Sequence, residues 1–424
     1  MNKLQRLLYA FGPYTDPREK AIGRFFARIR ENDNSKQTHR TLNRLLSQDI
    51  AAVNLWTEYR YKGYRYLTKS MRRDMYKNLE IIKADFETTS HDMQIDLEQI
   101  LAQISDLGVD TTKLRQKSDQ LQTFVQIMQY LSPANGRYVY RESSSFGRLL
   151  QNPAKQTLEG DCNQIVTLYI SLFATKHSIN DLELTVYPGH VALHLAGVDI
   201  ETTNGQFAHY TRTDASKVAV EEIVSINLLD TSDAYLNKNT VPSEIFLEAA
   251  RLAYILGSDR ALVEQNLSAA YNNTVVQLME RQQYSAALKY AKQSKDQYLV
   301  QTAGHNGSIH ALSAGKFAQA RSFAAHSKKR TDLLRSINYN EGVHLYNSKK
   351  YQSAITLFQK SGHSDMVLRC YEGLYFEQQN LLKNAKTVDD IKKLATTVRK
   401  LHHYATKSQN TKLIQHAKSL MKYL

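Results

Sequence analysis

Residues 158–174 read LEGDCNQIVTLYISLFA, and this stretch predicts a partly buried helix that begins beside a cysteine. Asp161 is of a type that caps helix N-termini, and the apolar residues after it recur at helical spacing. Cys162 therefore falls in the first turn, where the helix dipole and free backbone N–H groups lower a thiol pKa and can hold an oxyanion. The pattern indicates a nucleophile, although a cysteine at a helix start is more often a packed small residue.

Two strands predicted downstream carry candidate partners for this thiol. A thiolate needs a base to move its proton, and the base needs a third group to orient it. His190 heads the first strand, and alternation puts His194 on the same face, away from the aliphatic residues. In the next strand Asp199 and Glu201 share a face, so a carboxylate can reach the imidazole if the two faces adjoin. We interpret His194 as a surface residue rather than a second site residue.

Three motifs in this order resemble the transglutaminase-like superfamily of papain-fold cysteine enzymes. They are Gly-Asp-Cys at a helix start, Pro-Gly-His-Val at a strand start and an acid before Thr in the following strand. The resemblance covers residues 132–235. It implies that Cys162 forms a thioester with a carbonyl substrate, that His190 is acid and base, and that Glu201 orients the imidazole. The family more often has Asp in the third role, so Asp199 is the alternative acid.

Gln156, shortly before the cysteine, is a candidate oxyanion-hole amide as in papain-like enzymes, although polar loop residues are common. No Walker loop, GxGxxG, HExxH or EF-hand pattern is present, so we expect neither a cofactor nor a metal. Cys370 lies among apolar residues of a predicted helix and is expected in the core. The two cysteines lie far apart in segments of different character, which favours a reducing, cytoplasmic setting.

The C-terminal part contains an internal repeat. Aromatic residues at positions 284, 317 and 351 are each followed three residues later by Ala, and further columns agree. The agreeing columns are Ala287, Ala320 and Ala354, then Ala291, Ala324 and Phe358, then Ser294, Ser327 and Ser361. The pattern resembles the tetratricopeptide repeat, a helix–turn–helix unit with a small residue where its helices cross. It departs at the first-helix glycine column, which reads Val275, Ser308 and Gly342, and the terminal proline is absent. An arbitrary helical bundle is the alternative.

The chain has 424 residues, too many for one core, and its 6 Pro and 17 Gly favour helices over a turn-rich β fold. We expect a mainly helical α+β multidomain chain: a helical N-terminal region at 1–131, a papain-like, transglutaminase-like domain at 132–235 and a helical-repeat solenoid at 242–424. Net charge is +14. Residues 241–424 carry 26 Lys/Arg against 13 Asp/Glu, whereas 141–235 carry 6 against 12.

These features predict a cysteine enzyme that performs acyl transfer at an amide, by hydrolysis or transamidation, with repeats that recruit a protein partner. The basic repeats would suit an acidic partner. The alternative is a catalytically idle protein–protein interaction scaffold built from the same domains. Binding of nucleic acid or of an anionic membrane surface is less favoured, because a basic face often serves only solubility. No apolar run is long enough for a transmembrane segment.

Overall fold

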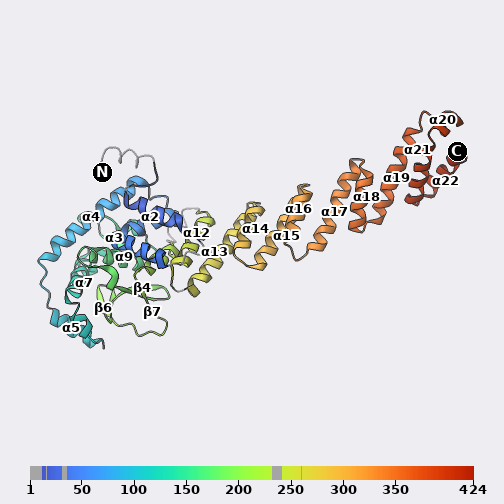
Figure 1. The fold of residues 1–424 in the computed structure, drawn as a ribbon. Helices are drawn as coiled ribbons and strands as arrows, with labels where there is room; N and C mark the ends of the chain where they lie inside the picture. The colour runs from blue at the N-terminus through green and yellow to red at the C-terminus, as the bar shows by residue number, and fades with distance from the viewer. Residues whose placement is uncertain (1–11, 16, 31–35, 232–240, 259) are drawn as a thin grey trace. The chain divides into compact units, whose positions relative to one another are not determined.

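The computed structural model describes residues 12–15, 17–30, 36–231, 241–258 and 260–424 (Figure 1). These residues are mainly helical, and they include a five-stranded antiparallel sheet and a two-stranded parallel one. This confirms the predicted mainly helical α+β class. The chain divides into two compact units, residues 1–270 and 271–424. The predicted boundary at 131–132 lies inside the first unit.

Helices before residue 131 supply much of the core of the first unit. They are α2 (Pro17–Arg28), α3 (Lys36–Tyr61), α4 (Lys69–His91), α5 (Leu97–Asp106), α6 (Thr112–Arg115) and α7 (Ser118–Tyr130). α3 breaks at Asp49, which has a non-helical φ of -167°, and its carboxylate accepts the N–H of Ala52 to restart the helix. One continuous hydrophobic core runs from Ile22 to Val263, so these helices and the sheet are buried together.

The five-stranded sheet has the order β6-β5-β4-β3-β7. Its strands are β3 (Glu183–Tyr187), β4 (His190–Leu195), β5 (Val198–Glu201), β6 (Gln206–Ala208) and β7 (Ser216–Ala219). The turn between β4 and β5 has only two residues, Ala196 and Gly197, both with positive φ (49° and 108°), as a tight hairpin requires. This turn places Leu195 opposite Val198 and therefore sets which side chains of β4 and β5 are neighbours.

Helix α9 (Cys162–Phe173) packs on β4 and is almost entirely buried, as its apolar composition predicts. The chain enters α9 through β2 (Leu158–Gly160), which pairs in parallel with β1 (Tyr138–Tyr140). Helix α8 (Phe146–Leu149) packs against β2 and α9. The first unit continues through α10 (Glu222–Leu229) and α12 (Ser243–Leu256), and α13 (Arg260–Glu280) follows. Helix α9 thus packs against the parallel strand pair, the antiparallel sheet and helix α3.

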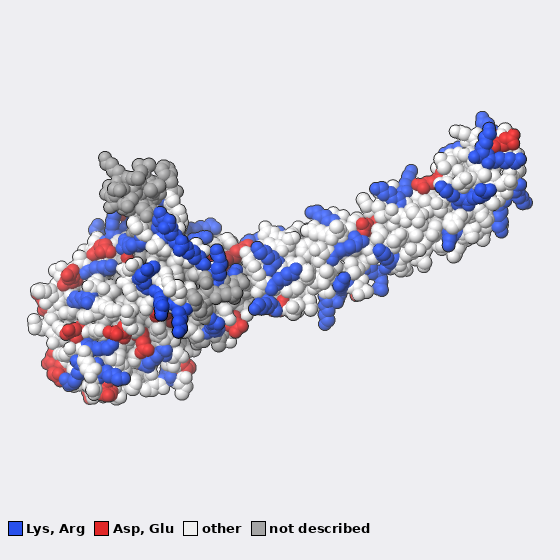
Figure 2. Space-filling model, viewed as in Figure 1, with Lys and Arg blue, Asp and Glu red and all other residues white. Residues whose placement is uncertain are grey.

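The second unit is a succession of helices in which neighbours along the chain pack on each other (Figure 1). They are α14 (Tyr284–Gln293), α15 (Gln297–Ser313), α16 (Phe317–Ala324), α17 (Arg330–Asn347), α18 (Tyr351–Ser361), α19 (Ser364–Leu381), α20 (Val388–Lys393), α21 (Ala395–Ser408) and α22 (Thr411–Met421). Figure 2 shows Lys and Arg side chains spread over its surface, with fewer Asp and Glu.

The residues of each repeat column occupy equivalent positions in these helices. The aromatic column supplies the first residue of α14, α16 and α18. The alanine column, Ala287, Ala320 and Ala354, is fully buried. A Cβ on Gly342 of α17 would lie 2.8 Å from the ring of Phe358, so a small residue is needed where these helices cross. Cys370 is buried as predicted, and burial raises its pKa to about 11.

Within the described residues, no helix combines the length and apolarity needed to cross a membrane.

Candidate active site

Cys162 is the first residue of α9 and is 9% exposed. The Asp161 carboxylate caps the helix by accepting the N–H groups of Asn163 (3.1 Å) and Gln164 (3.3 Å). The Gln164 side chain in turn accepts the Asp161 N–H at 2.9 Å, which completes a capping box. The capping box therefore fixes the start of the helix that carries the sulfur.

His190 and Glu201 meet at one end of the adjacent interior strands β4 and β5. His190 is the first residue of β4, and Glu201 is the last of β5. The imidazole Nε2 lies 2.5 Å from the Glu201 Oε2. Because Leu193 pairs with Ile200, Glu201 is diagonal to His190 rather than directly opposite, a position within reach of long side chains.

The Cys162 thiol donates to Asn163 Oδ1 at 3.8 Å and influences the pKa of His190. A hydrogen bond with Cys162 is the first cause, and the hydrogen bond with Glu201 the second, of a rise in the pKa of His190 to about 9. Burial alone would raise the pKa of Glu201, but hydrogen bonds from His190 and other donors outweigh it and lower the pKa to about 2. At neutral pH the pair is therefore an imidazolium and a carboxylate.

Comparisons with protein-family models, with curated proteins and with solved structures find no match for this chain. The chemistry of the site is therefore inferred from its own residues.

Asp199 does not contact His190. It pairs with His194, whose Nδ1 lies 2.7 Å from Asp199 Oδ1, and the two residues are register partners in β4 and β5. The prediction that His194 is a surface residue is wrong, because its side chain is buried at 5% exposure. The alternation argument placed it on the correct face but did not foresee that residues after β5 cover that face, where Tyr210 donates its N–H to Asp199 at 2.8 Å.

Thr203, Tyr210 and Tyr187 complete the surroundings of the His190–Glu201 pair and were missed by sequence reasoning. The Thr203 hydroxyl and N–H both donate to Glu201 Oε1, at 2.6 and 3.1 Å. The Tyr210 hydroxyl donates to Oε2 at 2.6 Å. The Tyr187 ring lies 5.0 Å from the His190 ring. Thr203 and Tyr187 are close to the motifs in sequence and could have been proposed from that, whereas nothing in the sequence singles out Tyr210.

Behind the capped helix end lies a buried group of charges. Burial is the first and the nearby Asp230 the second cause that raises the pKa of Asp161 to about 7. The Lys62 ammonium, 1% exposed, lies 3.7 Å from the Asp230 carboxylate. The Gln164 amide donates to Asp230 at 3.3 Å. The helical region before residue 131 therefore contributes a buried cation to the structure that supports Cys162.

Gln156, the candidate oxyanion donor, lies in the turn before β2, and its side chain is exposed. Its backbone N–H donates to Asn152 at 3.1 Å. Its role as an oxyanion donor stays a prediction.

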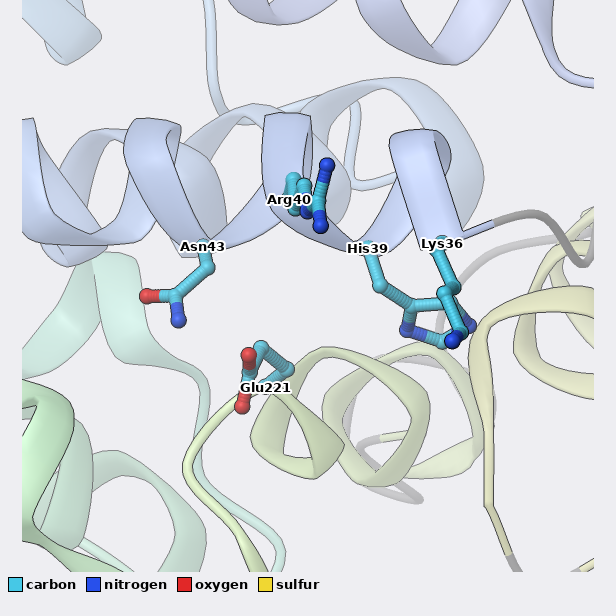
Figure 3. A pocket seen from close by; sticks show the side chains of 5 residues that line it. All are labelled: Lys36, His39, Arg40, Asn43 and Glu221. Atoms are coloured by element: carbon cyan, nitrogen blue, oxygen red, sulfur yellow. The ribbon is translucent and has the colours of Figure 1, made fainter.

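A pocket of about 350 Å³ lies elsewhere in the first unit, between the start of α3 and the residue before α10 (Figure 3). It is lined by Lys36, His39, Arg40, Asn43 and Glu221. None of the predicted site residues lines it. In the described part of the chain, no cluster of His, Cys, Asp and Glu side chains is arranged to hold a metal ion.

Proposed function

We propose that the chain is a transglutaminase-like cysteine enzyme that transfers an acyl group from an amide through a thioester. The observation that carries the proposal is the 2.5 Å contact between the His190 ring and the Glu201 carboxylate, supported by Cys162 being the first cause of the raised pKa of His190. The order of nucleophile, base and orienting acid is the one that nucleophilic catalysis needs. A papain-like arrangement of helix and antiparallel sheet is part of the same proposal.

The reaction would begin with attack of the Cys162 thiolate on the amide carbonyl carbon. The His190 imidazolium gives its proton to the departing nitrogen, so the C–N bond breaks, an amine leaves and a thioester remains. In the second half, neutral His190 takes a proton from water or from an amine as that nucleophile attacks the thioester. The C–S bond then breaks and the thiolate returns, with release of an acid or of a new amide. Glu201 holds the ring throughout and stabilises its charged form.

The start of α9 would stabilise the negative oxygen of the tetrahedral intermediate. The Asp161 carboxylate takes the N–H groups of Asn163 and Gln164. The N–H of Cys162 lies in the same first turn and is our candidate oxyanion donor, with the Gln156 amide as the second.

We further propose that the second unit is a tetratricopeptide-type solenoid that recruits a protein. The buried alanine column and the close approach at Gly342 support this, because they are what a repeated helix crossing requires. The excess of Lys and Arg favours a partner with an acidic surface. A reducing, cytoplasmic compartment would suit the enzyme, because both cysteines are free thiols.

The test is alkylation of Cys162 by iodoacetamide near pH 6, in the full chain with Cys370→Ser so that one thiol reports. We expect rapid alkylation that His190→Ala reduces at least tenfold, since an ordinary thiol of pKa about 8.5 is almost fully protonated at this pH. His209→Ala is the matched control, because His209 is exposed and its ring hydrogen-bonds to the Leu107 carbonyl at 3.2 Å. Slow alkylation in the chain that keeps His190 would contradict the enzyme and favour the interaction scaffold.

A further inference from the structure

The sheet carries two His–carboxylate pairs, and the proposed reaction uses only one of them. His190–Glu201 lies beside Cys162, whereas His194–Asp199 lies further along the same two strands. The Asp199 carboxylate is 0% exposed, yet it is charged. Burial would raise its pKa, but hydrogen bonds from His194, Thr185 and Tyr210 outweigh it and lower the pKa to about 2. A buried charge of this kind is costly unless it is fully bonded, so its bonds indicate what it holds in place.

The two carboxylate oxygens of Asp199 have different hydrogen-bond partners. Oδ1 accepts from Thr185 Oγ1 at 2.6 Å and from His194 Nδ1 at 2.7 Å, and the Lys217 ammonium lies 3.4 Å away. Gly197 donates its N–H to the other His194 nitrogen, Nε2, at 3.2 Å, and the Lys217 ammonium also lies 2.6 Å from Nδ1 and 3.1 Å from Nε2. These contacts leave the second oxygen, Oδ2, free to accept the Tyr210 N–H at 2.8 Å.

Tyr210 needs this bond because the sheet does not hold it. Strand β6 ends at Ala208, which pairs with Asp199, and Tyr210 comes after the last ladder residue. The Asp199 carboxylate takes the place of the missing ladder acceptor and anchors the backbone there. The Tyr210 side chain then turns back to β5, where its hydroxyl donates to Glu201 Oε2 at 2.6 Å. Of the two acidic residues of β5, Asp199 therefore accepts the backbone N–H of Tyr210, and Glu201 accepts its side-chain hydroxyl.

The Tyr210 hydroxyl bonds to the same Glu201 oxygen that faces the imidazole. Burial first, and then the bond to Glu201, raises the pKa of Tyr210, so the hydroxyl stays protonated and remains a donor. Its ring packs edge-on against Tyr187 at 5.4 Å, and Tyr187 lies on the His190 ring. Thr203 therefore donates to Glu201 Oε1, and Tyr210 donates to Glu201 Oε2.

We propose that Tyr210 is a positioning residue that holds the Glu201 carboxylate against His190, and that the buried His194–Asp199 pair positions Tyr210. Asp199 is then neither an alternative acid of the triad nor a mere core residue. It acts on the site through the backbone of Tyr210. This inference rests on the proposed function, because it assigns how the orienting acid of that site is kept in place.

The experiment is the pH profile of Cys162 alkylation by iodoacetamide, in the full chain with Cys370→Ser, for wild type and Tyr210→Phe. In wild type we expect a rate that stays high well below pH 8. In Tyr210→Phe, Glu201 is less firmly placed, the imidazolium is less stabilised, and the acid limb moves up by about half a pH unit or more, which is about threefold in rate on that limb. A merely structural role would lower stability without moving the limb.

Tyr130→Phe is the matched control, because its hydroxyl also donates to a carboxylate, Asp85 at 2.8 Å, but Tyr130 lies outside the site. Asp199→Asn should move the limb in the same direction, and adding it to Tyr210→Phe should move the limb no further, since both act through one contact. If the acid limb of the Tyr210→Phe profile stays in place or moves to lower pH, this inference is overturned while the proposed function still stands. A wild-type profile typical of an ordinary thiol overturns the proposed function as well.

Discussion

Glu201 lies one diagonal step across the sheet from His190, and its Oε2 is 2.5 Å from the imidazole Nε2. The nearer carboxylate in sequence, Asp199, lies directly opposite His194 and serves that histidine instead. The two-residue turn at Ala196 and Gly197 decides this assignment, since it sets the register of β4 and β5. Inserting or deleting one residue in that turn would shift the register by one and move both carboxylates to the opposite face of the sheet.

Glu201→Gln should lower the pKa of His190 and so destabilise its charged form. The hydrogen bond and charge of Glu201 both raise the pKa of His190, and the neutral amide lacks the charge. We expect the alkylation rate of Cys162 at pH 6 to fall about tenfold, which corresponds to about one pKa unit. Glu183→Gln, at an exposed position of the neighbouring strand β3, is the control and should leave the rate unchanged. Equal rates in both variants would show that Glu201 does not orient the base.

Asp161→Asn should change how stability depends on pH. Because the pKa of Asp161 is raised to about 7, the folded chain prefers the protonated carboxyl, and this residue lowers the free energy of unfolding as pH rises from about 4 to about 7. Asparagine caps helices well and has no charge to bury. We expect the variant to gain stability relative to wild type between pH 5 and pH 8, at about 1.4 kcal/mol for each pKa unit crossed.

Urea unfolding at pH 5 and pH 8, followed by fluorescence of the buried Trp56 in the first unit, measures this difference. His190 has a raised pKa and also contributes stability that is present below pH 6.5 and lost as pH rises through about 9. Both proteins contain His190, so the difference between them isolates Asp161. If the two proteins show the same change with pH, the buried-carboxyl account of the helix cap is wrong.

Arg72→Met should destabilise the first unit strongly. The Arg72 guanidinium is fully buried and donates to Glu19 at 2.8 Å, and also to the carbonyls of Leu67 and Pro13, each at 2.6 Å. The methionine would leave the Glu19 carboxylate buried without its cation, at a cost of about 3–5 kcal/mol. Trp56 fluorescence in urea is the measurement. Arg73→Met, at the exposed neighbouring position, should cost little, and Glu19→Gln should recover part of the loss when added to Arg72→Met.

The sequence was sufficient to propose Cys162, His190 and Glu201 because each lies at a locally readable place: a helix start, a strand start and a strand face. Whether Glu201 or Asp199 served His190 was left open, since both share that face and only the register separates them. Contacts between segments distant in sequence could not be predicted. Tyr210 lies after the end of β6 and contacts Glu201, and Lys62, the residue after the end of α3, contacts Asp230. No local pattern encodes either contact.

Contacts between helices of the repeats are likewise not encoded by a local pattern. Gly342 offers a direct test of the helix crossing there. A Cβ on Gly342 would lie 2.8 Å from the Phe358 ring, which is fully buried and cannot move away freely. Gly342→Ala should therefore destabilise the second unit by about 1–3 kcal/mol, despite the better helix propensity of alanine. Far-UV circular dichroism in urea should show the loss while Trp56 fluorescence, which reports the first unit, is unchanged.

Ser336→Ala, at an exposed position of the same helix, is the control and should be neutral or slightly stabilising. Phe358→Leu in the Gly342→Ala background should recover stability relative to the sum of the two single changes, because the smaller side chain makes room for the new methyl group. If Gly342→Ala were as stable as Ser336→Ala, α17 and α18 would not cross closely enough to need a small residue, and the tetratricopeptide-type interpretation of the second unit would lose its main physical support.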